Sequence, residues 1–149
     1  MTVSTLIAAE PETLEIATFS VGENLIGVDI RQVQEINRNM SIARVPHVPP
    51  KVRGVINLRG EVVTVIDLRV VLGLEPIGVT RMTRNIVLSS GGERIGLLVD
   101  SISDVVTASS ADIVDAPGNL SGVDGRFFRG VLKRDGELLL VLDVDEVLA

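Results

Sequence analysis

The stretch Gly54–Leu72, GVINLRGEVVTVIDLRVVL, occurs a second time in altered form at Gly130–Leu148, GVLKRDGELLLVLDVDEVL. Eight of the 19 aligned positions are identical, namely Gly54/Gly130, Val55/Val131, Gly60/Gly136, Glu61/Glu137, Val65/Val141, Asp67/Asp143, Val71/Val147 and Leu72/Leu148. Upstream, a shift of 69 residues places Ser20–Gly22 over Ser89–Gly91. Self-similarity of this kind indicates that one supersecondary unit occurs twice. The chain therefore reads as two copies of one small unit, about 14–73 and 84–149.

Each copy consists of short β-branched runs separated by turn residues, a pattern typical of an all-β sandwich or barrel. Asp135-Gly136, flanked by apolar runs, is the strongest single hairpin signal. The four expected hairpins span residues 16–29, 54–66, 85–99 and 131–142, with turns at Gly22–Asn24, Arg59-Gly60, Ser90–Gly92 and Asp135-Gly136.

Short helical turns are expected where the last strand of each copy ends. Asp67 and Asp143 stand at these ends, and a carboxylate in that place can cap the first free N–H groups of a helical turn. We therefore expect turns at Leu68–Leu72 and Val144–Leu148. Asp29 is expected to cap a further short helix, on which three apolar residues at a spacing of three would share one face. These three are Ile30, Val33 and Ile36, and the second copy has Ile102 and Val105 in place of the last two.

Composition narrows the range of functions. The chain has 149 residues, enough for one domain, with no Cys, one His and 2% aromatic residues. Without Cys there is no disulfide, thiolate metal site or cysteine nucleophile. A net charge of −6 argues against general binding to nucleic acid. No apolar run approaches the roughly 20 residues that span a bilayer, and the start of the chain does not read as a signal peptide. We expect a cytoplasmic protein with a flexible tail at residues 1–13.

Motifs that carry catalysis are missing from the sequence. There is no Walker loop, dinucleotide-binding glycine motif, zinc-protease motif or nucleophile elbow. His47 lies in a proline-rich segment without an acidic neighbour and is expected to be a surface loop residue. Asp143, Asp145 and Glu146 lack the further spaced oxygens of a calcium loop. We expect no catalytic residue, no metal and no cofactor.

Arg59 is the most unusual charge, because it occupies a tight turn between strongly apolar runs, whereas the second copy has Asp135 there. Its sequence position fits a solvated turn residue, but also an ion pair with Glu35 across the fold. The apolar residues Val33, Ile36, Ile102 and Val105 fit core positions, but also the lining of a groove between two barrels. Residue type alone leaves both questions open.

One set of motifs, in this order and spacing, resembles a known family. Its strongest part is VRGVINLRG at Val52–Gly60, continued by VIDLR at Val65–Arg69. Flanking matches are Gly27–Ile30, Val33–Ile36, Arg44–Pro46, Gly96–Asp100, Asp104-Val105 and Gly130–Asp143. From Leu14 to Leu148 the chain resembles the CheW family, the coupling proteins of bacterial chemotaxis. Thr64 departs from the pattern, since the family usually has Pro there, and we expect this to alter a strand edge rather than the function.

The resemblance implies an all-β fold of two SH3-like five-stranded β-barrels, an internal duplication with a shared core. It places one domain at 14–149, with subdomains at about 14–83 and 84–149. It also implies a non-enzymatic adaptor that joins the cytoplasmic hairpin tip of methyl-accepting chemoreceptors to the regulatory domain of the CheA histidine kinase. Contacts between barrels of successive molecules would build rings. Such a protein is cytoplasmic and reaches membrane receptor arrays through its protein partners, without inserting into the membrane.

The resemblance also implies roles for particular residues. The receptor-binding groove is expected to consist of Ile30, Val33, Ile36, Ile102 and Val105. Coupling is expected to depend on Gly54 and Arg59, with Glu35 as the ion-pair partner of Arg59. Val62 and Val123 are candidates for contact with the kinase.

Three alternatives remain open at this point. The protein could be an adaptor of another chemosensory pathway, serving twitching motility or second-messenger control. It could be a small-molecule sensor that uses the groove between the barrels as a pocket. It could be an enzyme, which the lack of a nucleophile–base pair or metal cluster opposes.

Overall fold

The computed structural model describes residues 11–120 and 122–148. Most of the expected tail, residues 1–10, lies outside this range. Glu12 and Thr13, the last residues of that tail, belong to the fold. The Glu12 backbone N–H donates to Ser110 Oγ at 2.8 Å, and its carbonyl accepts from Ser110 N at 2.8 Å. Thr13 begins the first strand, so the expectation of a tail through residue 13 is wrong at its end.

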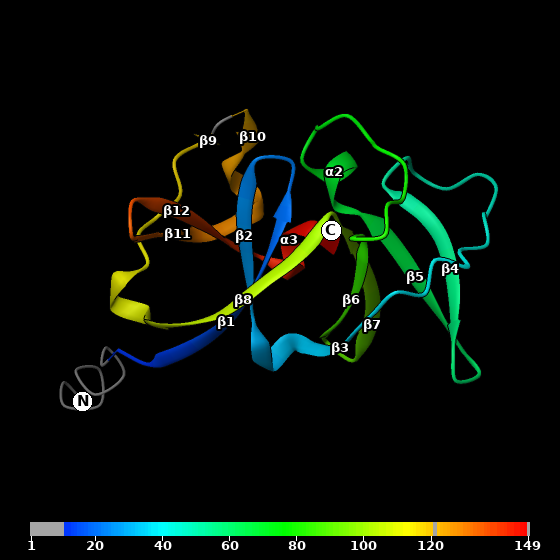
Figure 1. Ribbon diagram of the computed structural model, residues 1–149, viewed down its shortest axis with the longest axis horizontal. Helices are drawn as coiled ribbons and strands as arrows, with labels where there is room; N and C mark the ends of the chain where they lie inside the picture. The colour runs from blue at the N-terminus through cyan, green and yellow to red at the C-terminus, as the bar shows by residue number, and fades with distance from the viewer. Residues whose placement is uncertain (1–10, 121, 149) are drawn as a thin grey trace.

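Two five-stranded sheets lie side by side and make up most of the molecule (Figure 1). Sheet A has the strand order β11-β12-β2-β1-β8, and sheet B has the order β3-β6-β7-β5-β4. The strands of sheet A are β1 (Thr13–Val21), β2 (Asn24–Asp29), β8 (Ser101–Ser109), β11 (Phe128–Arg134) and β12 (Glu137–Leu142). Those of sheet B are β3 (Val33–Asn37), β4 (Val52–Leu58), β5 (Glu61–Asp67), β6 (Arg84–Ser90) and β7 (Glu93–Val99).

Short elements connect the sheets and close their ends. They are the 3-10 turns η1 (Ile30–Gln32), η2 (Ser110–Asp112) and η3 (Gly125–Phe127), the small hairpin β9 (Asn119–Leu120) and β10 (Val123–Asp124), and the helical turns α2 (Leu68–Val71) and α3 (Val144–Leu148). The expected caps are present, since Asp67 Oδ1 accepts from Arg69 N at 3.0 Å and Asp143 Oδ1 accepts from Glu146 N at 3.3 Å. All four expected hairpins are present too. The expected all-β fold with two SH3-like sheets is confirmed.

The two copies exchange their first hairpins. Sheet A combines β1 and β2 of the first copy with β8, β11 and β12 of the second, and sheet B combines β6 and β7 of the second with β3, β4 and β5 of the first. The parallel pairs β12–β2 and β5–β7 join the copies, with Val141 opposite Gly27 and Val65 opposite Gly96. The chain crosses between sheets at η1 and again at Asp100. The expected subdomains 14–83 and 84–149 therefore do not coincide with the sheets, which mix both segments.

One core lies between the two sheets and contains residues of both. Phe19, Ile26, Ile86 and Leu97 are fully buried in it. Full burial of one such side chain contributes roughly 1.5–3 kcal/mol, so this layer dominates the stability of the fold. Each sheet also curls around a smaller core of its own, on its other face. Neither sheet can bury its apolar residues without the other.

A single bridge links the free edges of each curled sheet, so each forms an open barrel. In sheet B, Ala43 and Val55 exchange two backbone hydrogen bonds, of 2.8 and 2.9 Å, and in sheet A Val114 and Val131 exchange two of 3.0 and 2.8 Å. The preceding residues are the repeated glycines, Gly54 and Gly130. A Cβ on either would overlap the carbonyl oxygen of the crossing residue, Ala43 or Val114. The repeat therefore retains glycine at this position because the chain crosses it closely.

Replacing Gly54 should unfold the protein more easily. Gly54→Ala forces a Cβ against the Ala43 carbonyl at a backbone φ of 148°, and strain of this kind costs about 1–3 kcal/mol. We expect a lower midpoint of urea unfolding, followed by circular dichroism. Gly78→Ala is the control, because a Cβ there meets nothing within 4 Å. Equal midpoints for Gly54→Ala and Gly78→Ala would contradict the crossing as the reason for glycine.

Candidate functional site

The hairpin turn that carries Arg59 has a defined geometry. Arg59 and Gly60 have φ values of 51° and 87°, and positive values at both central residues are those of a type I′ turn, which suits the twist of a hairpin. Asn57 Oδ1 accepts the Gly60 N–H at 2.8 Å and fixes the turn from within the strand. Asp135 and Gly136 form the same turn in the second copy. The turn therefore presents the residue before glycine to solvent.

Arg59 forms an ion pair with Glu35 of β3, as the sequence predicts. Arg59 Nη2 contacts Glu35 Oε1, and the Asn37 side-chain amide donates to Glu35 Oε2 at 3.1 Å. The hydrogen bond from Arg59, followed by that from Asn37, lowers the pKa of Glu35. The same pairing raises the pKa of Arg59. The side chain of Arg59 is 71% exposed and that of Glu35 is 25% exposed, so the pair is anchored on its acidic side and open to a partner on its basic side.

Gly54 lies at the far end of the strand from this pair. Five residues of extended chain separate it from Arg59, about 16 Å at roughly 3.3 Å per residue. Its place in the fold is the crossing with Ala43. Gly54 thus has a steric role in the structure, and it does not lie beside the ion pair of Arg59 and Glu35.

The predicted helix after Asp29 is only the single turn η1, with Asp29 Oδ1 accepting from Arg31 N at 2.9 Å. Val33 and Ile36 lie instead on strand β3. The register shifts between Val33 and Glu35, as at a β-bulge, so that Val33 opposes Leu88 and Ile36 opposes Ile86. Residues directly opposed in a sheet share a face. The bulge therefore places Val33 and Ile36, three positions apart, on one face of the sheet. The sequence also predicted a shared face for them, but on a helix.

Strand β8 repeats this arrangement in sheet A. Its register against β1 also shifts, and Ile102 opposes Phe19 while Val105 opposes Ala17. Both faces border the shared core. Strands β3 and β8 are edge strands of their sheets, so part of each face lies at the surface.

Four of the five predicted groove residues are at the surface. We call them the apolar edge surface: Ile30 (37% exposed), Ile36 (42%), Ile102 (37%) and Val105 (54%). Val33, the fifth, is half-buried and packs against the shared core. Receptor binding by this surface stays a prediction.

The two residues proposed for kinase contact differ in exposure. Val62 is 67% exposed at the start of β5. Val123 is only 1% exposed and belongs to the shared core. Glycines on either side of it, Gly122 and Gly125, are typical of a loop, but the β9–β10 pairing of Val123 with Leu120 folds both side chains into that core. Val123 offers no surface to a partner, and its assignment as a contact residue is wrong.

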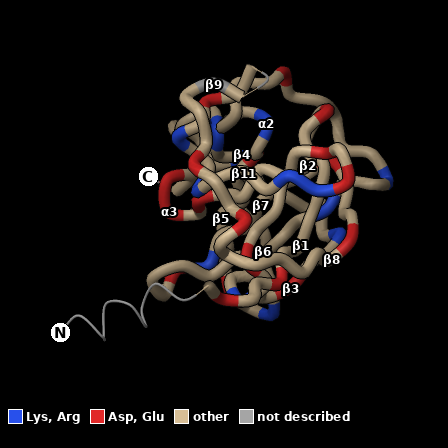
Figure 2. The backbone as a smooth tube through the Cα atoms, turned by 90° about the vertical axis from the view of Figure 1, so that its left-hand side faces the viewer, with Lys and Arg blue, Asp and Glu red and all other residues tan. Residues whose placement is uncertain are grey.

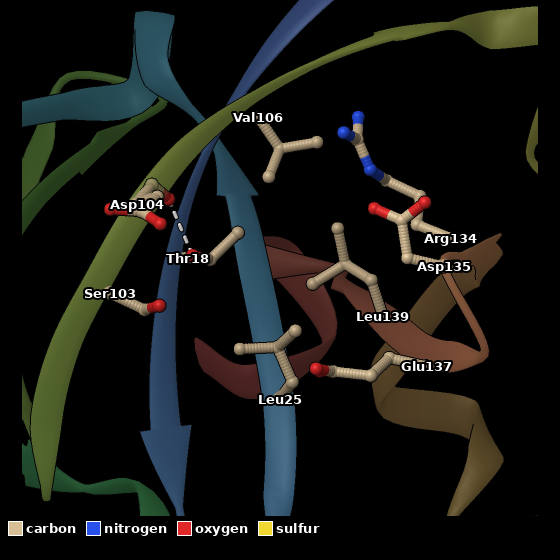
Figure 3. Close-up of a pocket in the computed structure, with 9 residues that line it drawn as sticks. All are labelled: Thr18, Leu25, Ser103, Asp104, Val106, Arg134, Asp135, Glu137 and Leu139. Atoms are coloured by element: carbon tan, nitrogen blue, oxygen red, sulfur yellow. Dashed lines mark hydrogen bonds between the residues drawn. The ribbon is translucent and has the colours of Figure 1, made fainter.

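The open end of the sheet A barrel contains a cavity of about 240 Å³ (Figure 3). Leu25 and Leu139 form part of its wall, and the carboxylates of Asp104, Asp135 and Glu137 surround it. In the internal repeat, these residues are equivalent to those at the end of the sheet B barrel, where Arg59 and Glu35 form their ion pair. The two barrel ends therefore have equivalent positions but differ in chemistry.

The sequence predicts neither a metal site nor a membrane-spanning segment, and the described residues bear on both. Within residues 11–120 and 122–148, no group of three or more His, Asp or Glu side chains could hold a metal ion. Among the same residues, no helix has the length and apolar character needed to cross a bilayer. Basic and acidic positions are interspersed along the backbone (Figure 2).

Comparisons with known proteins agree with this fold. The family model of the CheW-like domain matches residues 15–149. Chemotaxis protein CheW of Rhizobium meliloti (strain 1021) is 36% identical over 133 residues, which cover 89% of this chain and 86% of that protein. Chemotaxis protein CheW of Bacillus subtilis (strain 168) is 34% identical over 143 residues, covering 95% and 92%. The crystal structure of scaffolding protein TtCheW from Thermoanaerobacter tengcongensis matches with a TM-score of 0.85 at 30% identity, covering 95% and 91%.

The match to the CheW-like domain and to a scaffolding protein of the same fold makes this chain a scaffold or adaptor protein. The chain belongs to the CheW family of chemotaxis proteins.

The pKa of Glu35 should report whether the ion pair forms in solution. Its value is lowered in the folded state, so the pair stabilises the fold above the usual glutamate pKa of about 4.3 and this contribution is lost as pH falls through the lower folded value. Arg59→Ala should raise the midpoint of the Glu35 carboxyl titration, measured by carbon NMR. Lys133→Ala, which removes an exposed cation of sheet A, should leave it unchanged. An unchanged midpoint in Arg59→Ala would show that the pair is absent in solution.

Proposed function

We propose that this chain is a cytoplasmic adaptor that joins the cytoplasmic hairpin tips of methyl-accepting chemoreceptors to the regulatory domain of a CheA-type histidine kinase. In the same role it would supply barrel-to-barrel contacts for ring and array assembly. The observation that carries the proposal is the ion pair of Arg59 and Glu35 at an exposed turn, in a chain that the CheW-like domain matches from residue 15 to 149.

The apolar edge surface suits an amphipathic receptor helix. Such a helix places one apolar face against an apolar surface, and its contacts recur every three or four residues. Ile36 and Val105 are the most exposed members of the surface and would gain most from being covered. A fully buried aliphatic side chain contributes roughly 1.5–3 kcal/mol, and these half-exposed side chains would contribute a part of that.

The ion pair would act on specificity and orientation rather than on stability. An exposed pair is screened by water and stabilises a fold little. At an interface, the same charges suppress wrong partners and fix the orientation of the right one. The exposed guanidinium of Arg59 is available for this, while Glu35, itself bonded by Asn37, holds its inner side.

An adaptor needs no chemical step. Several weak contacts become strong once receptors are clustered, because each further contact forms at high effective concentration. Signalling then requires only that active and inactive receptors bias the bound kinase differently.

Coupling should depend on Arg59. We expect receptor-containing membranes to raise autophosphorylation of the kinase and to make it stimulus-sensitive when the wild-type chain is present. Arg59→Ala should lose most of this activation while remaining folded, as judged by circular dichroism. Arg38→Ala, which removes an exposed cation directly after β3, is the control. No activation by the wild-type chain with competent kinase and receptors would overturn the proposal and would favour another chemosensory pathway.

Receptor binding should depend on the apolar edge surface. Val105→Asp places a charge on an exposed apolar site and should weaken binding to receptor membranes about tenfold or more, equivalent to about 1.4 kcal/mol. Its unfolding temperature should stay near that of the wild type. Val33→Asp should instead lower the unfolding temperature, because Val33 packs on the shared core.

Val79→Asp is the matched control, since Val79 is 47% exposed on the loop between α2 and β6. Equal receptor binding by Val79→Asp and Val105→Asp would show that the apolar edge surface is not the receptor site.

A further inference from the structure

Both oxygens of the Glu35 carboxylate are occupied by different donors. Oε1 accepts from Arg59 and Oε2 accepts from the Asn37 side-chain amide at 3.1 Å. A carboxylate held at one oxygen can rotate about its side-chain bonds, whereas one held at both has a fixed plane. Asn37 therefore restricts the direction in which Glu35 can hold the Arg59 guanidinium.

Asn37 is itself held by a chain of amides that leads into the protein. Its Oδ1 accepts from the Asn39 backbone N–H at 2.9 Å. The Asn39 carbonyl accepts from the Asn85 side chain at 2.6 Å. Asn85 lies on β6 and is fully buried. The exposed ion pair is thus connected through three asparagines to a rigid, buried point of sheet B.

A second ion pair lies beside the first. Arg94 Nη1 and Glu61 Oε1 are 2.7 Å apart. Arg94 contributes electrostatically to the lowered pKa of Glu35, and Glu61 contributes to the raised pKa of Arg59. The two arginines and two glutamates form one balanced cluster, in which the orientation of Glu35 decides where the charge of Arg59 lies.

The other barrel shows that the fold does not require this cluster. In sheet A the repeat replaces the ion pair of Glu35 and Arg59 by two acids, Asp104 and Asp135. It also replaces Asn37 by Val106 and Arg94 by Leu25. These residues surround the open cavity instead of closing it with ion pairs (Figure 3). Sheet A lacks the cluster, yet its strands have the order equivalent to that of sheet B in the repeat. A feature that only one of two equivalent barrels contains has a task other than holding the barrel together.

We propose that Asn37 is a positioning residue, which orients the Glu35 carboxylate and thereby presents the Arg59 guanidinium to the partner in a single direction. This inference rests on the proposed coupling role of the ion pair. It adds a residue that contacts neither the partner nor Arg59 and acts through Glu35 alone.

Asn37→Asp keeps an oxygen that can accept from Asn39, removes the donor to Glu35 and places a second carboxylate beside Glu35. Asn37→Ala removes the donor without adding a charge and should act in the same direction. We expect the Glu35 titration midpoint to rise, as followed by carbon NMR, with an unfolding temperature close to that of the wild type. Kinase activation in the receptor-membrane assay should fall roughly three- to tenfold, the range expected from the net loss of one exposed hydrogen bond. Asn37→Gln, which retains an amide donor, should recover part of the activation.

Gln34→Ala is the matched control, because Gln34 is an exposed amide residue on the same strand. It should change neither the Glu35 midpoint nor the activation. If Arg59→Ala abolishes activation while Asn37→Asp retains wild-type activation, the positioning role of Asn37 is wrong and the coupling role of the pair stands. If Arg59→Ala itself retains full activation, the coupling role fails first, and the inference about Asn37 fails with it.

Discussion

The parallel pairing of β12 with β2 and of β5 with β7 is the constraint on which the rest of the structure depends. It joins the first hairpin of each copy to the sheet of the other, so neither copy can complete a sheet by itself. The exchange brings the two sheets against one shared core. It also leaves β3 and β8 as edge strands beside that core. The surface proposed to bind receptors exists because the hairpins are exchanged.

Local features of the fold were predictable because local physics determines them. Glycine at the second turn position predicted two hairpin turns, which the structure shows to be type I′, and Asp67 predicted the helical turn that it caps. The repeat itself predicted two equivalent sheets. The exchange was not predictable, because the repeat shows which segments are equivalent but not which of them pair. Pairing of Leu140 with Ile26 joins residues far apart in the chain, and no local pattern records it.

The candidate site was predictable only where the family resemblance named residues. Glu35 and Arg59 carry opposite charges, and the resemblance paired them. Val123 was misassigned because glycines nearby indicate a loose loop, whereas its burial depends on the tertiary contact of the β9–β10 hairpin. Asn37 was missed because an asparagine in a strand has no distinctive spacing. Its alternation with Glu35 on β3 was the available signal, since residues two apart on a strand share a face.

Duplication also explains how one small chain can serve two unlike partners. Two identical barrels would offer identical ends, and a symmetric molecule binds two copies of the same partner. Here the shared core requires both sheets, so neither can be lost, but the residues at the barrel ends are free to differ. Arg59 and Glu35 at one end belong to a charge-balanced cluster, whereas the carboxylates of Asp104, Asp135 and Glu137 outnumber the single cation Arg134 at the other. Two ends that differ in charge can discriminate between partners, and this asymmetry suits an adaptor that joins unlike proteins.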